Sequence, residues 1–231
     1  TAPEMKSATT DTLGFLQHVL DVSFVEDANA FGNNVISIAR SEQASSAGLS
    51  YFPNLYHDIG MDVFIATGYE YPEFRTLTLT NYDYELLIHE LGHALGLTHP
   101  FAANGSNGET LSAFEDRTTN TVMSYNDNAI TFDGTFRALD WMILTKYYGV
   151  KASHNSGDDT YTFSSSGGTF IIDGAGIDTI SANDALSDVT VDLRPGSHSH
   201  IGAKSVHITS ANQLTISHGS DIENGETGSG N

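Results

Sequence analysis

Three histidines lie close together in the sequence, with a spacing that can hold one metal ion. They belong to the run His89–His99, which reads H-E-L-G-H-A-L-G-L-T-H. On a helix, His89 and His93 are four residues apart and share one face, so both imidazoles can reach the same ion. Gly96 tolerates a left-handed backbone that ends the helix, and His99 can then return as a third ligand. Three neutral nitrogens with an open fourth position are the catalytic arrangement for zinc.

An acidic residue stands next to the first of these ligands. From position 90, the carboxylate of Glu90 can accept a proton from a water held by the ion. The run therefore predicts a hydrolytic zinc enzyme with Glu90 as its general base. Three histidines could also fall on a helix and a loop by chance, but a glycine at the required break disfavours that alternative.

The composition limits the partners of the chain. Its 231 residues include 9 Lys and Arg against 29 Asp and Glu, which gives a formal net charge of −20. Such a surface repels phosphate backbones and anionic lipids, so we expect neither nucleic-acid nor membrane binding. It suits hard cations such as calcium, which prefer oxygen ligands. The absence of cysteine excludes disulfides, thiolate metal sites and cysteine nucleophiles.

The first part of the chain carries the elements that must position the histidine motif. Apolar spacing predicts helices at Pro3–Leu20, Tyr82–Leu97 and Leu139–Tyr148. Short runs with β-branched or apolar residues predict strands at Val22–Val25, Val35–Ala39, Leu49–Phe52 and Met61–Ala66. Asp140 is predicted to cap or start the third helix. Long loops are expected over Phe101–Ala138, with Glu109, Glu115 and Asp116 in contact with solvent.

The composition changes near Gly149. Only three aromatic residues follow it, namely Tyr161, Phe163 and Phe170. Strands are predicted at Thr160–Phe163, Thr169–Ile172, Val189–Leu193, Val206–Thr209 and Gln213–Ser217, between turns rich in Gly and Asp. We therefore expect an α+β chain with two domains, residues 1–149 and residues 150–231.

Two further features resemble a known group, the metzincin metallopeptidases, and within it the serralysin family of bacterial secreted proteases. Pro100 directly follows the third histidine, and Thr121–Tyr125 reads T-V-M-S-Y, similar to the family's Met-turn. The resemblance implies that Met123 forms an apolar floor beneath the zinc. It also implies that Tyr125 reaches the zinc or swings away to stabilise the tetrahedral intermediate. Without the upstream motif, an ordinary core methionine and a structural tyrosine would be the better interpretations.

The resemblance extends into the second half of the chain. Residues 157–163 and 173–178 resemble the strands and turns that begin the family's calcium-binding β-roll, although Asn155 and Asp159 stand where we would expect Arg and Thr. The implied calcium ligands are Asn155, Gly157, Asp159, Asp173, Ala175, Gly176, Asp178, Asp221 and Glu223. Ordinary β-turns are the alternative for this region. Residues 225–231 resemble the first nonapeptide repeat, cut off before the rest of the array.

The fold implied for residues 1–149 is a metzincin-type protease domain, a twisted sheet with the zinc-motif helix, here without the family's first strand. Residues 150–231 would form the start of the β-roll. The implied function is a secreted, extracellular and monomeric zinc endopeptidase with structural calcium. Its partners would be protein substrates and a proteinaceous inhibitor. We expect an extended substrate to pair with the edge strand Leu49–Phe52.

Two alternatives compete with this interpretation. A non-catalytic calcium-binding adhesion or scaffold module would require the loss of a site residue, and none is lost. A matrixin-like peptidase is disfavoured by Pro100 and Tyr125.

Overall fold

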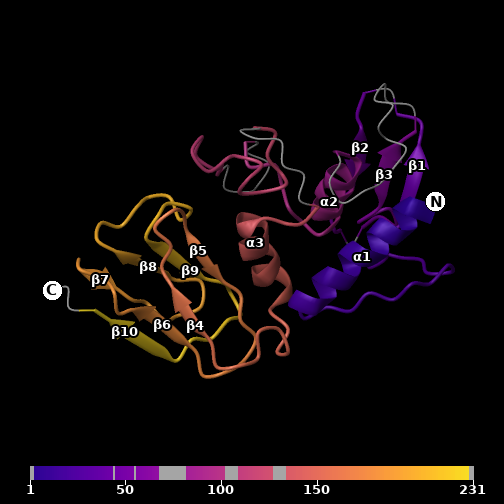
Figure 1. The fold of residues 1–231 in the computed structure, drawn as a ribbon. Coiled ribbons are helices and arrows are strands. Elements are labelled where there is room, and N and C mark those ends of the chain that lie inside the picture. The colour runs from indigo at the N-terminus through magenta and orange to yellow at the C-terminus, as the bar shows by residue number, and fades with distance from the viewer. Residues whose placement is uncertain are drawn as a thin grey trace. The chain divides into compact units, whose positions relative to one another are not determined.

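The computed structural model describes residues 3–43, 45–54, 56–67, 82–101, 109–126 and 134–228, and it has an α+β architecture (Figure 1). The chain forms two compact units. Unit 1 contains Thr1–Phe15 and Phe24–Asp140, and unit 2 contains Leu16–Ser23 and Trp141–Asn231. The domain boundary between residues 149 and 150 stays a prediction. Among the described residues, no helix has both the length and the apolar character needed to cross a membrane.

A small sheet organises unit 1. Its strands are β1 (Ile38–Ser41), β2 (Gly48–Ser50) and β3 (Val63–Ala66), in the order β1-β3-β2. β3 pairs parallel with β1 and antiparallel with β2, and it is the most deeply buried of the three. Within the described part of the chain, β2 is therefore an edge strand of this sheet.

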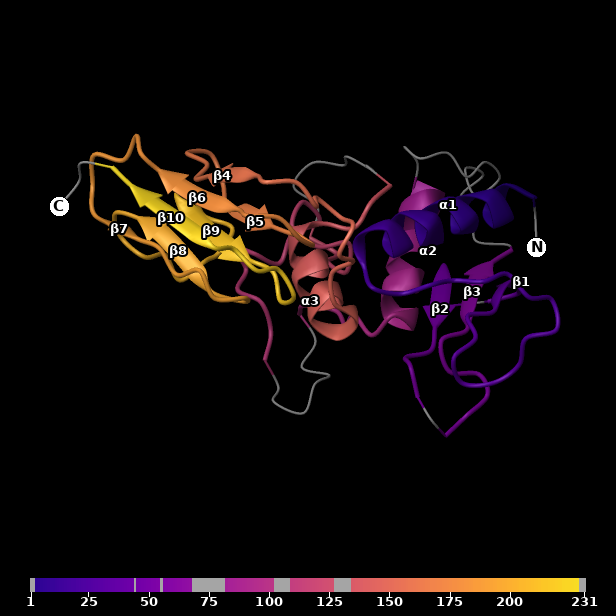
Figure 2. The same cartoon turned by 90° about the horizontal axis from the view of Figure 1, so that it is seen from below.

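Helix α2 (Tyr82–Ala94) packs against β2 and β3, and it carries the histidine motif (Figure 2). Almost every residue of α2 is buried, including the polar ones. Helix α1 (Pro3–Val19) contributes its first part to unit 1, where Thr12 Oγ1 lies 3.1 Å from the Tyr84 hydroxyl. A helix buried on nearly all sides is held firmly, which favours precise placement of its side chains.

Unit 2 is built from two sheets. The first has the order β10-β6-β4, and all of its strands are parallel. The second has the order β5-β9-β8-β7. The strands are β4 (Thr160–Thr162), β5 (Thr169–Ile171), β6 (Thr179–Ala182), β7 (Val189–Thr190), β8 (His198–Ile201), β9 (Gln213–Ile216) and β10 (Asn224–Thr227). The chain thus passes back and forth between the two sheets.

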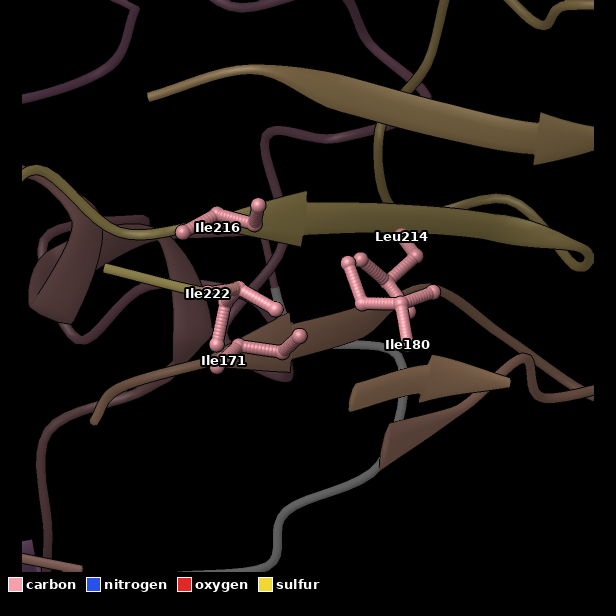
Figure 3. Packing of buried hydrophobic residues seen from close by; sticks show 5 residues of the cluster. All are labelled: Ile171, Ile180, Leu214, Ile216 and Ile222. Carbon is pink, nitrogen blue, oxygen red and sulfur yellow. The ribbon is translucent and has the colours of Figure 1, made fainter. Parts of the chain in front are cut away.

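The core of unit 2 lies between these sheets. Figure 3 shows Ile180 of β6 beside Leu214 of β9, with Ile171, Ile216 and Ile222 gathered next to them. All five side chains are buried. Because few aromatic residues are available here, aliphatic side chains from both sheets supply the core. Helix α3 (Ala138–Tyr148) begins in unit 1 and continues into unit 2.

Several strand predictions were wrong or shifted. Residues 22–25 and 206–209 form no strand, and Val25 and Val206 are 86% and 89% exposed. A β-branched run becomes a strand only when a neighbouring strand and a packed face are available, and these runs have neither among the described residues.

Other strands differ in their bounds or escaped prediction. The run predicted at Val35–Ala39 becomes β1 only from Ile38 onward, and the run predicted at Val189–Leu193 ends at Thr190 in β7. Strands β6, β8 and β10 were not predicted. Each has only four residues; β6 alternates polar and apolar residues over too short a run to stand out, and β8 and β10 are mostly polar.

Candidate metal centre

The end of α2 turns the chain so that the third histidine can return to the first two. Gly96 has a φ of +97°, in the left-handed region, as predicted. The N–H of Leu97 donates to the carbonyl of Gly92 at 2.9 Å, and the N–H of Gly96 donates to the carbonyl of His93 at 2.9 Å. This pair of bonds is a Schellman ending, which satisfies the last carbonyls of the helix. The chain then leads directly to His99.

The three histidines converge as the motif predicted. His99 Nε2 lies 3.2 Å from Nε2 of His89 and 3.2 Å from Nε2 of His93. One nitrogen from each ring falls within 4.8 Å of the others, so the group can hold a metal ion. The donor set has nitrogens only, which suits zinc better than a hard cation such as calcium.

Backbone carbonyls fix the orientation of two of these rings. His89 Nδ1 lies 2.8 Å from the carbonyl oxygen of Val122, and His93 Nδ1 lies 2.8 Å from that of Leu97. A carbonyl can only accept, so Nδ1 carries the proton in both rings and Nε2 offers its lone pair. Burial lowers the pKa of His89 to about 3 and that of His99 to about 4, and it also lowers the pKa of His93. The rings are therefore neutral at pH 7, as metal ligands must be.

Glu90, the residue after His89, has a buried carboxylate. Its side chain is 5% exposed, and Oε2 has no hydrogen-bond partner among the described residues. Burial raises the pKa of Glu90 to about 7. Gly48 of β2 makes room for this side chain, because a Cβ at that position would lie 2.4 Å from Glu90 Oε1. The site thus contains a buried carboxylate that is poised to exchange a proton near neutral pH.

The Met-turn residues lie beside the histidines. Met123 is buried, and a Cβ at Gly92 would lie 2.8 Å from its sulfur, so Met123 packs directly against the motif helix. The hydroxyl of Tyr125 lies 2.9 Å from His99 Nε2, although the residue is 64% exposed. Phe101 stacks on His99, with ring centroids 5.0 Å apart. The structure therefore brings both resemblance-based residues, Met123 and Tyr125, to the site.

Two acids in the loop after the histidine motif are buried, although the sequence predicted that they would be solvated. Asp116 and Glu115 were predicted to be solvated, but they are only 6% and 7% exposed, whereas Glu109 is exposed as predicted. Asp116 accepts hydrogen bonds from Ser124 Oγ at 2.6 Å and from Asn126 Nδ2 at 2.7 Å. The prediction failed because hydrophilic composition around a carboxylate does not reveal partners that lie eight and ten residues away.

Asp140 has the predicted role and an additional one. It lies in the first turn of α3 and accepts a hydrogen bond from the N–H of Arg137 at 2.8 Å, which is half of a capping box. It also accepts from Thr121 Oγ1 at 2.6 Å and from the N–H of Val122 at 2.9 Å. Since the carbonyl of Val122 contacts His89, Asp140 supports the backbone that orients the first histidine. Only the capping role had a sequence signal.

Unit 2 contains a second cluster, made of carboxylates. Asp159, Asp173 and Asp178 each place a carboxylate oxygen within 4.8 Å of the others. Asp178 is fully buried; its Oδ1 accepts the N–H of Asp159 at 2.8 Å, and its Oδ2 has no hydrogen-bond partner among the described residues. Burial raises the pKa of Asp173, and the hydroxyl of Tyr161 donates to its Oδ2. Three acids held together repel one another unless a cation is shared.

The remaining predicted calcium ligands surround this cluster in different ways. A Cβ at Gly176 would lie 2.1 Å from the carbonyl oxygen of Gly157, so the two predicted turns are in close contact. The N–H of Ala175 donates to Asp173 Oδ1 at 3.1 Å. Asn155 adopts a φ of +45° and donates from its side chain to the Ile172 carbonyl. These turns therefore bend the chain tightly around the acids.

The last two predicted ligands lie outside the group of three carboxylates. Glu223 Oε2 accepts the backbone N–H of Asp178 at 2.7 Å, and Asp221 is exposed. Glu223 therefore supports the backbone at Asp178.

Comparison with known proteins identifies relatives of one kind. No protein-family profile matches the chain. The chain is 32% identical over 196 residues to Serralysin of Proteus mirabilis, which covers 68% of this chain and 40% of that protein. It is 27% identical over 245 residues to Metallopeptidase AprA of Pseudomonas marginalis, with 92% of this chain and 50% of the relative covered. It is also 27% identical over 207 residues to a Serralysin C of Dickeya chrysanthemi, with coverages of 79% and 41%.

The chain spans half or less of the length of these curated relatives. Within that span lie the histidine cluster, the buried glutamate and the Met-turn, which are the features that suggested the family. The chain therefore belongs to the serralysin-type metzincins.

Proposed function

We propose that this chain is the catalytic part of a secreted zinc endopeptidase that hydrolyses peptide bonds in extracellular proteins. The observation that carries the proposal is the convergence of the three histidine Nε2 atoms beside the buried carboxylate of Glu90. The named serralysin relatives support the same reaction class. The monomeric state and the proteinaceous inhibitor remain predictions.

The residues fit a zinc ion. His89, His93 and His99 would hold it through Nε2, because the Nδ1 atoms of two of the rings already face backbone carbonyls. All three rings are neutral at pH 7, so no proton must be removed before an ion binds. Zinc, when bound, supplies a Lewis acid that polarises the attacking water and the scissile carbonyl.

Glu90 moves the proton in this scheme. Its carboxylate accepts a proton from the attacking water and then delivers it to the leaving amine. A pKa of about 7, raised by burial, allows the group both to take up and to release a proton near neutral pH. The missing side chain of Gly48 leaves the space that the carboxylate occupies beside β2, since a Cβ there would overlap Glu90 Oε1.

Tyr125 would act on the charge that develops on the substrate. Its hydroxyl lies at the histidine cluster, 2.9 Å from His99 Nε2, and can donate a hydrogen bond to an oxyanion formed there. Because the residue is 64% exposed, its ring has room to move toward a bound peptide. The peptide would lie extended along β2, whose Gly48–Ser50 segment overlaps the predicted edge strand.

Calcium is the second ion that we propose, and its place is unit 2. Support comes from the three carboxylates and from the buried, unpartnered Oδ2 of Asp178, an oxygen that a cation would satisfy. The carbonyl of Gly157, close to Gly176, is a further oxygen at this place. In this role the ion stabilises the turns and takes no part in hydrolysis.

Casein hydrolysis and zinc content, measured on the same preparation, test the proposal. We expect about one zinc per chain, loss of hydrolysis after chelation, and recovery when zinc is added back. Zinc binding without any hydrolysis would instead support the non-catalytic module. Hydrolysis that survives complete removal of zinc would contradict the proposed function.

A further inference from the structure

We infer that Asp116 positions Tyr125 for hydrolysis by holding the residues on both sides of it. This inference rests on the proposed function, since it gives Asp116 a role in the same reaction. Asp116 does not contact the histidine cluster in any described hydrogen bond, so it is a positioning residue that acts through Tyr125.

The two oxygens of Asp116 each hold one neighbour of Tyr125. Oδ1 accepts from Ser124 Oγ at 2.6 Å, and Oδ2 accepts from Asn126 Nδ2 at 2.7 Å. A third hydrogen bond links the two neighbours to each other, because the N–H of Asn126 donates to Ser124 Oγ at 3.0 Å. The Asn126 amide also donates to the backbone carbonyl of Asp116 at 3.1 Å. Residues 124 and 126 are therefore tied to one buried carboxylate.

The hydrogen bonds of Asp116 to Ser124 and Asn126 form a clamp on the backbone of Tyr125, while the contacts of Tyr125 itself come from its ring and hydroxyl. The residue is 64% exposed, whereas Ser124 before it is buried. Its ring stacks on His89 and is tilted against His99 and Phe101, with centroid distances of 5.6, 4.8 and 4.9 Å. Its hydroxyl lies 2.9 Å from His99 Nε2. The position of an exposed side chain is set mainly by its backbone. Here that backbone is fixed at both neighbours.

The burial of Asp116 is itself a reason to expect a specific role. A buried carboxylate costs free energy unless hydrogen bonds compensate for its lost hydration. Both oxygens of Asp116 make short bonds to the same three-residue segment. The proposed mechanism assigns this charge no direct part, yet its partners flank the residue that is proposed to stabilise the oxyanion. Its chemical effect is thus the placement of the Tyr125 hydroxyl.

The test is a double-mutant cycle between Asp116→Ala and Tyr125→Phe, with kcat and KM measured for a peptide substrate. Tyr125→Phe should lower kcat about 10²-fold, the usual loss for an oxyanion donor, with little change in KM. Asp116→Ala should lower kcat about tenfold or more in the wild-type background. In the Tyr125→Phe background it should lower kcat less than about threefold, because the group that it positions is already absent.

Two further variants sharpen the cycle. Asp116→Asn keeps the size of the side chain and can hydrogen-bond both neighbours if one of them reorients, so it should recover most of the lost kcat. Ser124→Ala removes only one of the two ties and should show the same dependence on Tyr125, more weakly. If Asp116→Ala does not fold, the Ser124→Ala cycle takes its place. An equal loss of kcat in both Tyr125 backgrounds would overturn the inference.

Hydrogen exchange provides a readout that does not depend on hydrolysis. In Asp116→Ala, the amides of Ser124 and Asn126, which donate to the Thr121 carbonyl and to Ser124 Oγ, should exchange faster. Those of the α2 segment His89–Ala94 should keep their protection. If wild-type protein hydrolyses nothing, the proposed function fails, but this exchange pattern still tests the clamp. Unchanged exchange at Ser124 and Asn126 would overturn the inference even in an active enzyme.

Discussion

The two ion sites are built on opposite principles. In unit 1, three neutral imidazoles come from one helix and the turn that ends it, and hydrogen bonds to carbonyls orient two of them. In unit 2, three carboxylates come from separate turns, Asp159 before β4 and the pair Asp173 and Asp178 between β5 and β6. The first set needs no ion to relieve repulsion. The second does, because like charges lie within 4.8 Å of one another.

Because of this difference, we expect the nitrogen site to serve hydrolysis and the oxygen site to serve the stability of unit 2. The nitrogen site is positioned by a buried helix, so loss of its metal should remove hydrolysis and leave most of the fold. The oxygen site joins turns that would otherwise repel, so loss of its cation should loosen unit 2. Substitutions at each site can therefore test the two halves of this contrast separately.

The largest effect is expected from Glu90→Gln. The amide keeps the shape of the side chain but cannot accept a proton, and a lost general base typically lowers kcat by about 10²–10⁴-fold. Zinc content should stay at the wild-type level, because Glu90 is not one of the three proposed ligands. Steady-state kinetics and elemental analysis measure both. Retention of more than about a tenth of the wild-type kcat would exclude the general-base role.

Gly48→Ala should disturb the same carboxylate from the other side. The new Cβ would lie 2.4 Å from Glu90 Oε1, so the side chain or the strand must move. A displacement of about 1 Å near the chemistry can cost about 10²-fold in rate. Gly14→Ala is the matched control, since a Cβ there meets nothing within 4 Å and lies in α1. The control should keep its kcat, and equal losses in both variants would rule out the steric explanation.

Asp178→Asn should remove the response of stability to calcium. Asn can still accept the N–H of Asp159, but its amide nitrogen cannot bind a cation at the place of Oδ2. At a calcium concentration of 100 times the Kd, the wild-type protein gains about 2.7 kcal/mol of stability, and the variant should gain almost none. Asp158→Asn removes the same charge from a residue outside the cluster of Asp159, Asp173 and Asp178, so it should keep the stabilisation by calcium. Thermal unfolding with and without calcium measures this, and a full response in Asp178→Asn would contradict the proposed site.

The smallest effect concerns Asp140, which supports the Met-turn. Burial raises its pKa to about 6, partly offset by hydrogen bonds from Thr121, Val122 and Arg137 and by the charge of Arg137. A folded-state pKa above the unfolded value contributes stability that is complete below about pH 4 and is lost as the pH rises through about 6. Asp140→Asn should remove this part of the pH dependence. Identical pH profiles of the unfolding free energy for both proteins would show that Asp140 does not titrate as described.

The zinc site could be predicted from the sequence because its information is local. His89 and His93 are four residues apart on one helix, and Gly96 ends that helix with the left-handed φ that the motif requires. Helical periodicity and one glycine therefore fix most of the geometry. The three main helices were predicted for the same reason, although α2 ends at Ala94, short of the predicted Leu97.

What escaped prediction depends on distant partners. The burial of Asp116 requires Ser124 and Asn126 to fold back onto it, and no periodic pattern in a loop indicates that. The runs at 22–25 and 206–209 have strand composition but no paired neighbour in the described structure. In the other direction, β10 reads N-G-E-T and all four of its residues are exposed, yet it pairs with β6. Whether such a segment becomes a strand, or such a carboxylate is buried, depends on contacts with segments that are distant in the sequence.

Selective removal of the two metals tests the central contrast most directly. A chelator for hard cations, used at a strength that spares zinc, should lower the thermal midpoint and loosen the strands of unit 2 while the zinc content stays constant. Adding calcium back should restore the midpoint. Removal of zinc should abolish hydrolysis with a smaller effect on the midpoint. Thermal unfolding with elemental analysis at each step provides the readout. An unchanged midpoint after calcium removal, or a collapse of unit 2 on loss of zinc alone, would contradict the account.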